Sequence, residues 1–219
     1  MTTTTTTVPP KPKPKPKPKW TARRVVREVA ILAAFALAFL SARSSIADHY
    51  HVPSGSMMPT VEIGDRIVVS KAAYGVRVPF TRHVIAELDG PARGDVVVLE
   101  SPDPGDDGKV LLKRVAAVPG DRVAVRHGQI FLAGREVKQE TRADGTYEIL
   151  DGVEHRIELG NGPGPDLEEI VIPPERYLVL GDNRGDSRDG RELGLVPREN
   201  ILGRAARVYW RGGPAWTPL

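Results

Sequence analysis

The chain has 219 residues, a formal net charge of +3 and no cysteine. This length suffices for one globular domain of about 150 to 180 residues with an appendage. The lack of cysteine excludes disulfide bonds, thiol catalysis and thiolate zinc sites. Much of the excess lysine lies before residue 20, so the charge gives no reason to expect a nucleic-acid partner.

The N-terminal segment, residues 1–22, combines a threonine run with alternating lysine and proline. Such a sequence cannot bury a core, so we predict an extended, solvated arm without a fold. Residues 23–47 contain an apolar run from Val29 to Leu40, and arginines flank it. Counted from 25 to 46, with the arginines snorkelling, the segment reaches the roughly 20 residues of a single transmembrane helix.

Arginines at 23, 24 and 27 precede this apolar run. The positive-inside rule therefore places the arm in the cytoplasm and everything after residue 47 outside the plasma (inner) membrane. The same segment also fits a cleavable secretory signal, because Ser45-Ile46-Ala47 has small residues at the two positions that a cleavage site requires. Either interpretation exports residues 48–219.

From Val61 onward the sequence predicts short β-strands. The candidate segments are rich in Val, Ile and Leu and are bounded by Gly, Asp and Pro. They are 66–70, 95–100, 110–118, 122–126, 129–132, 177–180 and 201–209. His127-Gly128 is typical of a hairpin turn. No comparable helical pattern follows residue 47, so we expect a mainly β fold with coiled, barrel-like antiparallel sheets.

The region of about 133–172 is more polar and is Gly-rich around Asn161 to Pro165. Its composition predicts an inserted, partly mobile subregion, and we assign no chemistry to it.

Two hydroxyl groups stand close together much earlier in the chain, in the run Pro53-Ser54-Gly55-Ser56. A serine attacks a carbonyl at neutral pH only when a nearby base removes its proton, so this run poses the question of which residue is the base.

Lys113 is the first candidate for that base. It stands beside Arg114 in a mostly apolar strand, so at least one of the two side chains must point toward the interior or a cleft. Burial lowers a lysine pKa, and a fall of about three units, costing about 4 kcal/mol, makes the amine useful near neutral pH. The alternative from spacing alone is a Lys113 that pairs with an acid at the sheet surface.

A third stretch, from Gly181 to Arg191, is dense in charge and follows an apolar strand. Its alternating carboxylate and amide side chains permit a calcium loop. Three interleaved arginines, and the lack of a glutamate that closes the loop, favour reciprocal Asp and Arg pairing instead. We therefore expect neither a metal nor a cofactor. A Ser-His-Asp triad that uses Ser56 stays open, because triads are assembled from distant positions.

Three separated stretches resemble one family in order. They are Pro53-Ser-Gly-Ser-Met-Met-Pro-Thr60 with Ile63-Gly-Asp65, then Lys113-Arg-Val-Ala-Ala-Val-Pro-Gly-Asp121, then Gly181-Asp-Asn-Arg184 with Ser187, Asp189 and Arg191. The ordered set resembles the bacterial type I signal peptidases, membrane-anchored serine proteases that remove signal peptides from exported proteins. The resemblance covers most of residues 52–207 and favours a retained anchor.

The resemblance implies a Ser-Lys dyad, with Ser56 as nucleophile and Lys113 as general base. It implies an oxyanion hole formed by the Ser56 backbone N–H and the Ser54 hydroxyl, and it gives Ser187 the role of orienting the Lys113 amine. Four further residues would hold the loop against the dyad: Asp182, Arg184, Asp189 and Arg191. One departure is Gly190, where the family usually has serine, and Glu192-Leu193 replaces an aromatic pair.

The same resemblance implies preproteins with small residues one and three positions before the cut, bound as an added β-strand. The segments 110–112 and 51–53 are the expected walls, the lipid bilayer is the other expected partner, and we expect a monomer. Two other functions remain open: a Ser-Lys autoprotease or specialised processing peptidase of the same fold, and a non-catalytic, membrane-tethered β-domain.

Overall fold

The structure is a computed structural model that describes residues 22–45, 47–78, 81 and 84–219. The arm predicted at residues 1–22 lies outside this range except for its last residue, as does Ile46 of the candidate cleavage motif. Two units are distinguished, residues 1–39 and 40–219, and each is described by itself.

The first unit contains most of helix α1 (Ala22–Ser45), which confirms the helix predicted over 23–47. Alanines and leucines, which favour helices, fill its middle. Val26, Leu32 and Phe35 are among its exposed apolar side chains. Within the described part of the chain, no helix combines the length and the apolarity needed to cross a membrane, so only the helix itself is confirmed.

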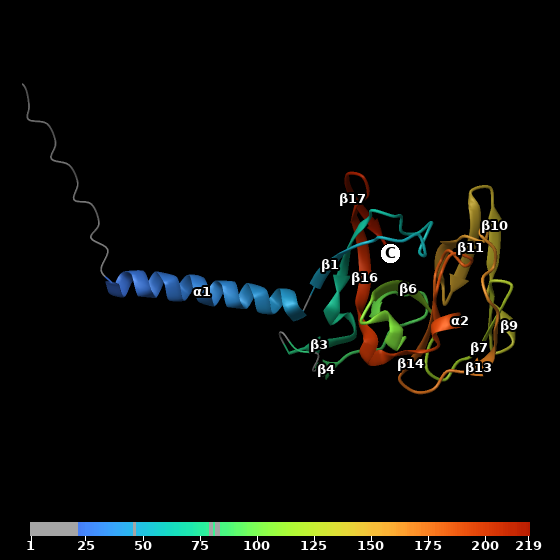
Figure 1. Cartoon of the computed structure of the whole chain (residues 1–219), viewed down its shortest axis with the longest axis horizontal. Coiled ribbons are helices and arrows are strands. Elements are labelled where there is room, and N and C mark those ends of the chain that lie inside the picture. Colours follow the sequence, from blue (N-terminus) through green and yellow to red (C-terminus); the bar gives the residue numbers. More distant parts are fainter. Residues whose placement is uncertain (1–21, 46, 79–80, 82–83) are drawn as a thin grey trace, which may run out of the picture. The chain divides into compact units, whose positions relative to one another are not determined.

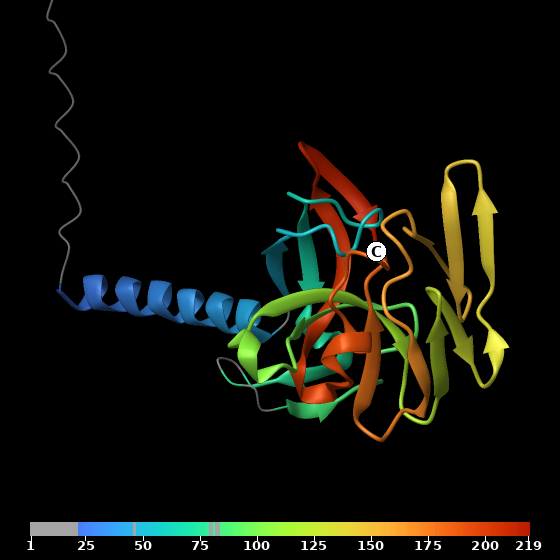
Figure 2. The ribbon, with the colours of Figure 1, turned by 45° about the vertical axis from the view of Figure 1, so that its right-hand side comes forward.

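The second unit is mainly β, as predicted, and its largest sheet is curled and antiparallel (Figures 1 and 2). The strand order is β1-β2-β16-β5-β6-β14-β15, with β17 added beside β16. The bounds are β1 (Ala47–His51), β2 (Arg66–Ser70), β5 (Val96–Glu100), β6 (Val110–Ala117), β14 (Arg176–Leu180), β15 (Val196–Pro197), β16 (Ile201–Trp210) and β17 (Pro214–Pro218).

Three smaller sheets complete the described strands. Their orders are β13-β7-β8-β9, β10-β11-β12 and β3-β4. The bounds are β3 (Gly75–Arg77), β4 (Val84–Glu87), β7 (Arg122–Arg126), β8 (Gln129–Leu132), β9 (Arg135–Glu136), β10 (Gln139–Arg142), β11 (Gly145–Leu150), β12 (Val153–Ile157) and β13 (Leu167–Val171). The short helices are α2 (Gly190–Leu193) and the 3-10 turns η1 (Lys71–Tyr74), η2 (Pro104–Asp106) and η3 (Arg198–Asn200).

All seven predicted strands are present. The hairpin β7–β8 turns at His127 and Gly128, which have φ of 50° and 78°, and it pairs Arg126 with Gln129. Two consecutive residues with positive φ are what a tight type I′ hairpin requires, and glycine adopts this conformation without strain. The polar region 133–172 holds β10–β12, which lie at the end of the domain away from β1 (Figures 1 and 2).

The apolar core of the second unit forms three clusters of buried residues. One of them includes residues of the loop between β1 and β2, which carries Ser54 and Ser56. That cluster combines residues of β2, β5 and β16 with Val52, Met57 and Val61 from the loop between β1 and β2. Met57 is 1% exposed and Val61 is fully buried. Burial of each such side chain stabilises the fold by about 1.5–3 kcal/mol, so the loop that carries Ser56 is anchored on both sides of that residue.

Candidate active site

Ser56 stands at the start of a tight turn. The Met58 N–H donates to the Gly55 carbonyl oxygen at 3.0 Å, and the Val61 N–H donates to the Met57 carbonyl oxygen at 2.9 Å. Because Met57 is buried in the core, the preceding hydroxyl is held at the wall of a cleft. The Ser56 N–H donates to no acceptor in the parts of the chain that the structure describes.

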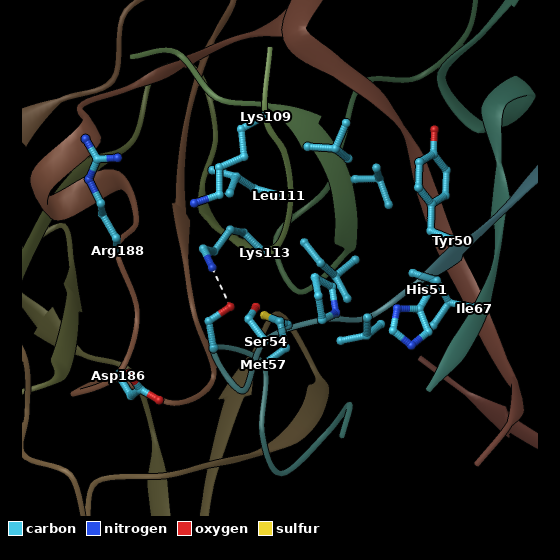
Figure 3. A pocket seen from close by; sticks show the side chains of 16 residues that line it. Tyr50, His51, Ser54, Met57, Ile67, Lys109, Leu111, Lys113, Asp186 and Arg188 are labelled. Atoms are coloured by element: carbon cyan, nitrogen blue, oxygen red, sulfur yellow. Dashed lines mark hydrogen bonds between the residues drawn. The ribbon is translucent and has the colours of Figure 1, made fainter. Parts of the chain in front are cut away.

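Lys113 enters the same cleft from strand β6, where it pairs with Val97 of β5. The side chain is almost completely buried, and its Nζ donates to the Ser56 Oγ at 2.7 Å (Figure 3). Burial lowers the pKa of Lys113 to about 8, although the negative charges of Asp189 and Asp182 act in the opposite direction. The structure therefore brings the two residues of the expected dyad together.

The cleft around this pair has a volume of about 460 Å³. Both expected walls line it, His51–Pro53 on one side and Val110–Leu112 on the other. Ser54 also lines the cleft. The remaining apolar lining consists of Tyr50, Met57, Ile67 and Val98.

The segment 181–191 packs directly against the Ser56 loop. The Asn183 N–H donates to the Ser56 carbonyl oxygen at 3.2 Å, and its Nδ2 donates to the Gly55 carbonyl oxygen at 3.3 Å. Gly181 permits this approach, because a Cβ at that position would lie 2.5 Å from the Ser56 carbonyl oxygen. Glycine is thus required here for close packing rather than for an unusual φ.

Asp182 and Asp189 bind arginines, as the interleaved charges predicted, but the arginine that binds Asp182 lies outside the segment. Asp189 accepts from Arg191 Nε at 2.8 Å, within the segment. Asp182 accepts from Arg114 Nε and Nη2 at 2.9 and 2.8 Å. Burial alone would raise the pKa of Asp182, but the Arg114 guanidinium outweighs it and holds that pKa below its usual range.

Arg184 pairs with Glu148 of β11 rather than with a neighbour in sequence. Its Nη2 and Nη1 donate to the Glu148 Oε2 and Oε1 at 2.6 and 3.1 Å, and both side chains are fully buried. His155 Nε2 of β12 lies 3.3 Å from the same carboxylate. Burial would raise the pKa of Glu148, but Arg184 and His155 lower it to about 2. The region 133–172, to which we assigned no chemistry, therefore contributes structural partners to Arg184.

Three hydrogen bonds of Thr60 and Asp65 tie the Ser56 loop to segments that are distant in sequence. Thr60 Oγ1 donates to Asp182 Oδ2 at 2.5 Å, so the loop is joined through Asp182 to Arg114, the neighbour of Lys113. Arg211, in the β16–β17 turn, donates from Nη2 to Asp65 Oδ2 at 2.6 Å and to the Thr60 carbonyl oxygen at 3.1 Å.

Ser187 is placed differently from our expectation. Its hydroxyl donates to Asp189 Oδ2 at 2.8 Å, and among the described residues no hydrogen bond joins it to the Lys113 amine. Asp189 also accepts from the Gly181 N–H at 2.8 Å. Gly190 packs tightly against β14, because a Cβ there would lie 2.8 Å from the Val179 carbonyl oxygen.

Several residues around the site had no assigned role in the sequence. Asn183 and Thr60 belong to the family-like stretches of the sequence, but their spacing does not indicate which atoms they bind. Glu148 and His155 did carry a signal. They occupy the same face of their strands as the buried Leu150 and Ile157, so strand alternation places polar side chains in a core position.

Comparison with known proteins agrees with this site. The model of the family described as signal peptidase, peptidase S26, matches residues 23–210. Signal peptidase I of Pseudomonas fluorescens is 34% identical over 189 residues, which cover 76% of this chain and 66% of that protein. Signal peptidase I of Leptolyngbya laminosa is 30% identical over 178 residues, which cover 78% and 72%.

A crystal structure of a signal peptidase I from Enterococcus faecalis is 22% identical, with a TM-score of 0.38, and the match covers 54% of this chain and 98% of that chain. The chain spans a little under two thirds, 66%, of the length of the Pseudomonas relative. The family match extends over most of the chain, including the Ser56, Lys113 and 181–191 segments. The chain belongs to the signal peptidase family, peptidase S26.

Proposed function

We propose that this protein is a serine endopeptidase that removes N-terminal signal peptides from exported preproteins, cutting after small residues of the Ala-X-Ala type. Ser56 is the nucleophile and Lys113 its general base. The observation that carries the proposal is the 2.7 Å separation of Lys113 Nζ and Ser56 Oγ inside a cleft. Membership of the signal peptidase family supports the substrate class.

The first chemical step begins with a neutral Lys113. The amine accepts the Ser56 hydroxyl proton while Oγ attacks the carbonyl carbon of the scissile bond, which gives a tetrahedral intermediate and a lysine ammonium. A pKa of about 8 makes this amine a far better base near neutral pH than an exposed lysine, whose pKa is about 10.4. The ammonium then protonates the departing amine, and the acyl group stays on Ser56.

Stabilisation of the oxyanion falls to the Ser56 loop. The Ser56 N–H has no acceptor within the described segments, and the neighbouring Ser54 lines the same cleft. These two donors would bind the negative oxygen, and one such donor is worth about 100- to 1000-fold in rate. In the second step Lys113 takes a proton from water, the hydroxide attacks the acyl carbon, and Ser56 leaves with the proton returned by Lys113.

Asn183, Ser187 and Asp189 support the position of the Ser56–Lys113 dyad. Asn183 donates to the carbonyl oxygens of Gly55 and Ser56, and Asp189 accepts a hydrogen bond from the Ser187 hydroxyl. Ser187 acts on Lys113 indirectly, through the position of Asp189. The walls at 51–53 and 110–112 suit a substrate strand with small side chains, which would pair with residues 110–112 of β6, the part of that strand that β14 leaves unpaired.

The test is cleavage of a purified preprotein by the purified full chain and by Ser56→Ala and Lys113→Ala. We expect both variants to lose at least about 1000-fold in kcat/KM. Lys138→Ala is the matched control, because this exposed lysine pairs with Glu140 at the surface. Full activity in either site variant would refute the dyad.

The pH dependence gives an independent check. Because the neutral amine is the reactive form, kcat/KM should rise with pH through an apparent pKa of about 8 and then level off. A profile that is flat from pH 5 to 9 would point to another base.

We also propose that α1 attaches the protein to the plasma (inner) membrane, with the arm in the cytoplasm and residues 48–219 outside. Exposed apolar side chains along α1, such as Leu32 and Phe35, and the arginines at its N-terminal end support this proposal. Cell fractionation of the full chain and of a chain lacking residues 22–45 tests it. Equal recovery of both in the soluble fraction would contradict it.

A further inference from the structure

We propose that Asp186 selects substrates with a lysine or arginine in the first positions after the scissile bond. The inference rests on the proposed function and extends it to a part of the cleft that accommodates the mature end of the preprotein. It concerns specificity, since Asp186 takes no part in the proton transfers between Ser56 and Lys113.

The position of Asp186 is the first argument. Its side chain lines the cleft, and its Oδ2 lies 3.8 Å from the point that a Cβ on Gly55 would occupy. The carboxylate therefore borders the residue that precedes Ser56. Figure 3 shows it on the opposite side of the Lys113–Ser56 hydrogen bond from Tyr50 and Ile67, which belong to the apolar part of the lining.

The second argument is that the carboxylate of Asp186 has no partner among the described residues. The neighbouring Arg188 donates to Asp103 and Asp106, and Ser187 donates to Asp189. The side chain of Asp186 is exposed, and in the parts of the chain covered by the structure it makes no hydrogen bond or ion pair. Its backbone N–H donates to the Asn183 carbonyl oxygen at 3.2 Å, which fixes this free carboxylate at the cleft.

The direction of the substrate assigns this carboxylate to residues after the cut. A peptide whose scissile carbonyl lies at Ser56 Oγ extends to both sides of that atom. Small residues before the cut suit the apolar walls at 51–53 and 110–112, so the segment after the cut passes toward Asp186. A cationic side chain there would gain an ion pair with the carboxylate, whereas an acidic one would be repelled.

Lys109 provides a charge of opposite sign for comparison. It lines the same cleft from the segment before β6 and is also exposed. Its amine disfavours cations, so removal of Lys109 should leave the preference for lysine unchanged or increase it. Removal of Asp186 should abolish the preference.

The experiment compares peptides that carry Lys, Ala or Glu at the first, second or third position after the cut, with the residues before the cut unchanged. The readout is the ratio of kcat/KM for the Lys peptide to that for the Glu peptide, in which effects on the dyad cancel. For at least one position we expect a ratio of about 5 to 10 in the unaltered protein. We expect about 1 in Asp186→Asn and an inverted ratio in Asp186→Lys.

Two controls make the outcome decisive. Asp107→Asn removes an exposed acid outside the cleft lining and should keep the ratio of the unaltered protein. Lys109→Gln should keep or raise it. Failure to cleave the Ala peptide would refute the proposed function itself. Cleavage of the Ala peptide with a ratio near 1 at all three positions, or with a ratio that Asp186→Asn does not change, would overturn the inference.

Discussion

Two adjacent residues of β6 bury a positive charge in opposite ways. Lys113 and Arg114 are 2% and 3% exposed. Arg114 has a carboxylate partner, Asp182, with two hydrogen bonds. Lys113 donates instead to the neutral hydroxyl of Ser56. Both side chains are buried, but among the described residues Lys113 has no carboxylate that accepts a hydrogen bond from it, and burial lowers its pKa to about 8.

The comparison extends to the other buried arginines of the site. Arg184 has Glu148 and Arg191 has Asp189, each at hydrogen-bonding distance. Arginine stays protonated and presents a planar fork to a carboxylate, whereas lysine releases its proton when burial is not offset. The arginines paired with carboxylates thus stabilise the site, whereas Lys113 can release its proton and act as a base.

The largest expected effect comes from breaking a scaffold pair. Glu148→Gln leaves the Arg184 guanidinium buried without its counter-charge, so we expect the free energy of unfolding to fall by about 3–5 kcal/mol. Urea unfolding at neutral pH measures this loss. Glu140→Gln is the matched control, because Glu140 belongs to a surface group with Arg142, and its urea midpoint should not shift. Equal shifts in the two variants would show that the buried pair is not special.

A second prediction concerns the stability cost of the unpaired lysine. The pKa of Lys113 is near 8 when folded and about 10.4 when unfolded, so between these values the unfolded chain binds one proton more. Stability should rise with pH across this window by about 3 kcal/mol, and below pH 8 the full cost applies.

Lys113→Met should remove that rise and, at neutral pH, stabilise an inactive protein. Urea unfolding at several pH values from 7 to 10 tests this, with Lys138→Met as the control for an exposed lysine. Parallel stability curves for the unaltered protein and Lys113→Met would contradict the low pKa of Lys113.

The smallest loss of activity is expected from the hydrogen bond between Thr60 and Asp182, which connects the Ser56 loop to the paired Arg114. Thr60→Val removes the hydrogen bond to Asp182 while Arg114 still pairs with that acid, so we expect about 1–2 kcal/mol, or roughly tenfold, in kcat/KM. The loss should appear in kcat, since Thr60 does not line the cleft. Thr60→Ser should restore it. A loss in thermal stability alone, with kcat unchanged, would reduce Thr60 to a packing residue.

Sequence patterns predicted the strands that bury apolar side chains and the turn that joins two of them. Strand β6 and the hairpin of β7 and β8 appeared with bounds within one residue of those expected. Strands β1 and β10 were not predicted, because edge strands with polar side chains lack the apolar signal. These two strands are ordered by pairing with β2 and β11, and the periodicity of apolar residues in a sequence carries no information on such pairing.

The candidate site shows the same division. The motifs indicated Ser56 and Lys113 from residue type, and the fold brings them together across 57 residues. Residue type could not indicate that Arg184 reaches Glu148, or that the Ser187 hydroxyl faces Asp189, because hydrogen-bond partners depend on the tertiary packing of two loops. Strand parity at Glu148 was the available signal, and it had no weight while the region was taken for a polar insertion.

The tie between Arg211 and the Ser56 loop has a consequence for the synthesis of the protein. Arg211 contacts Asp65 across 146 positions, and Asn183 contacts Gly55 across 128. Contacts this distant in sequence form late, since the intervening chain must first be ordered. A growing chain that still lacks Arg211 has Ser56 and Lys113 but not the contacts that fix Asp65 and the Thr60 carbonyl group, so we expect the cleft to be completed only after the C-terminal hairpin has docked.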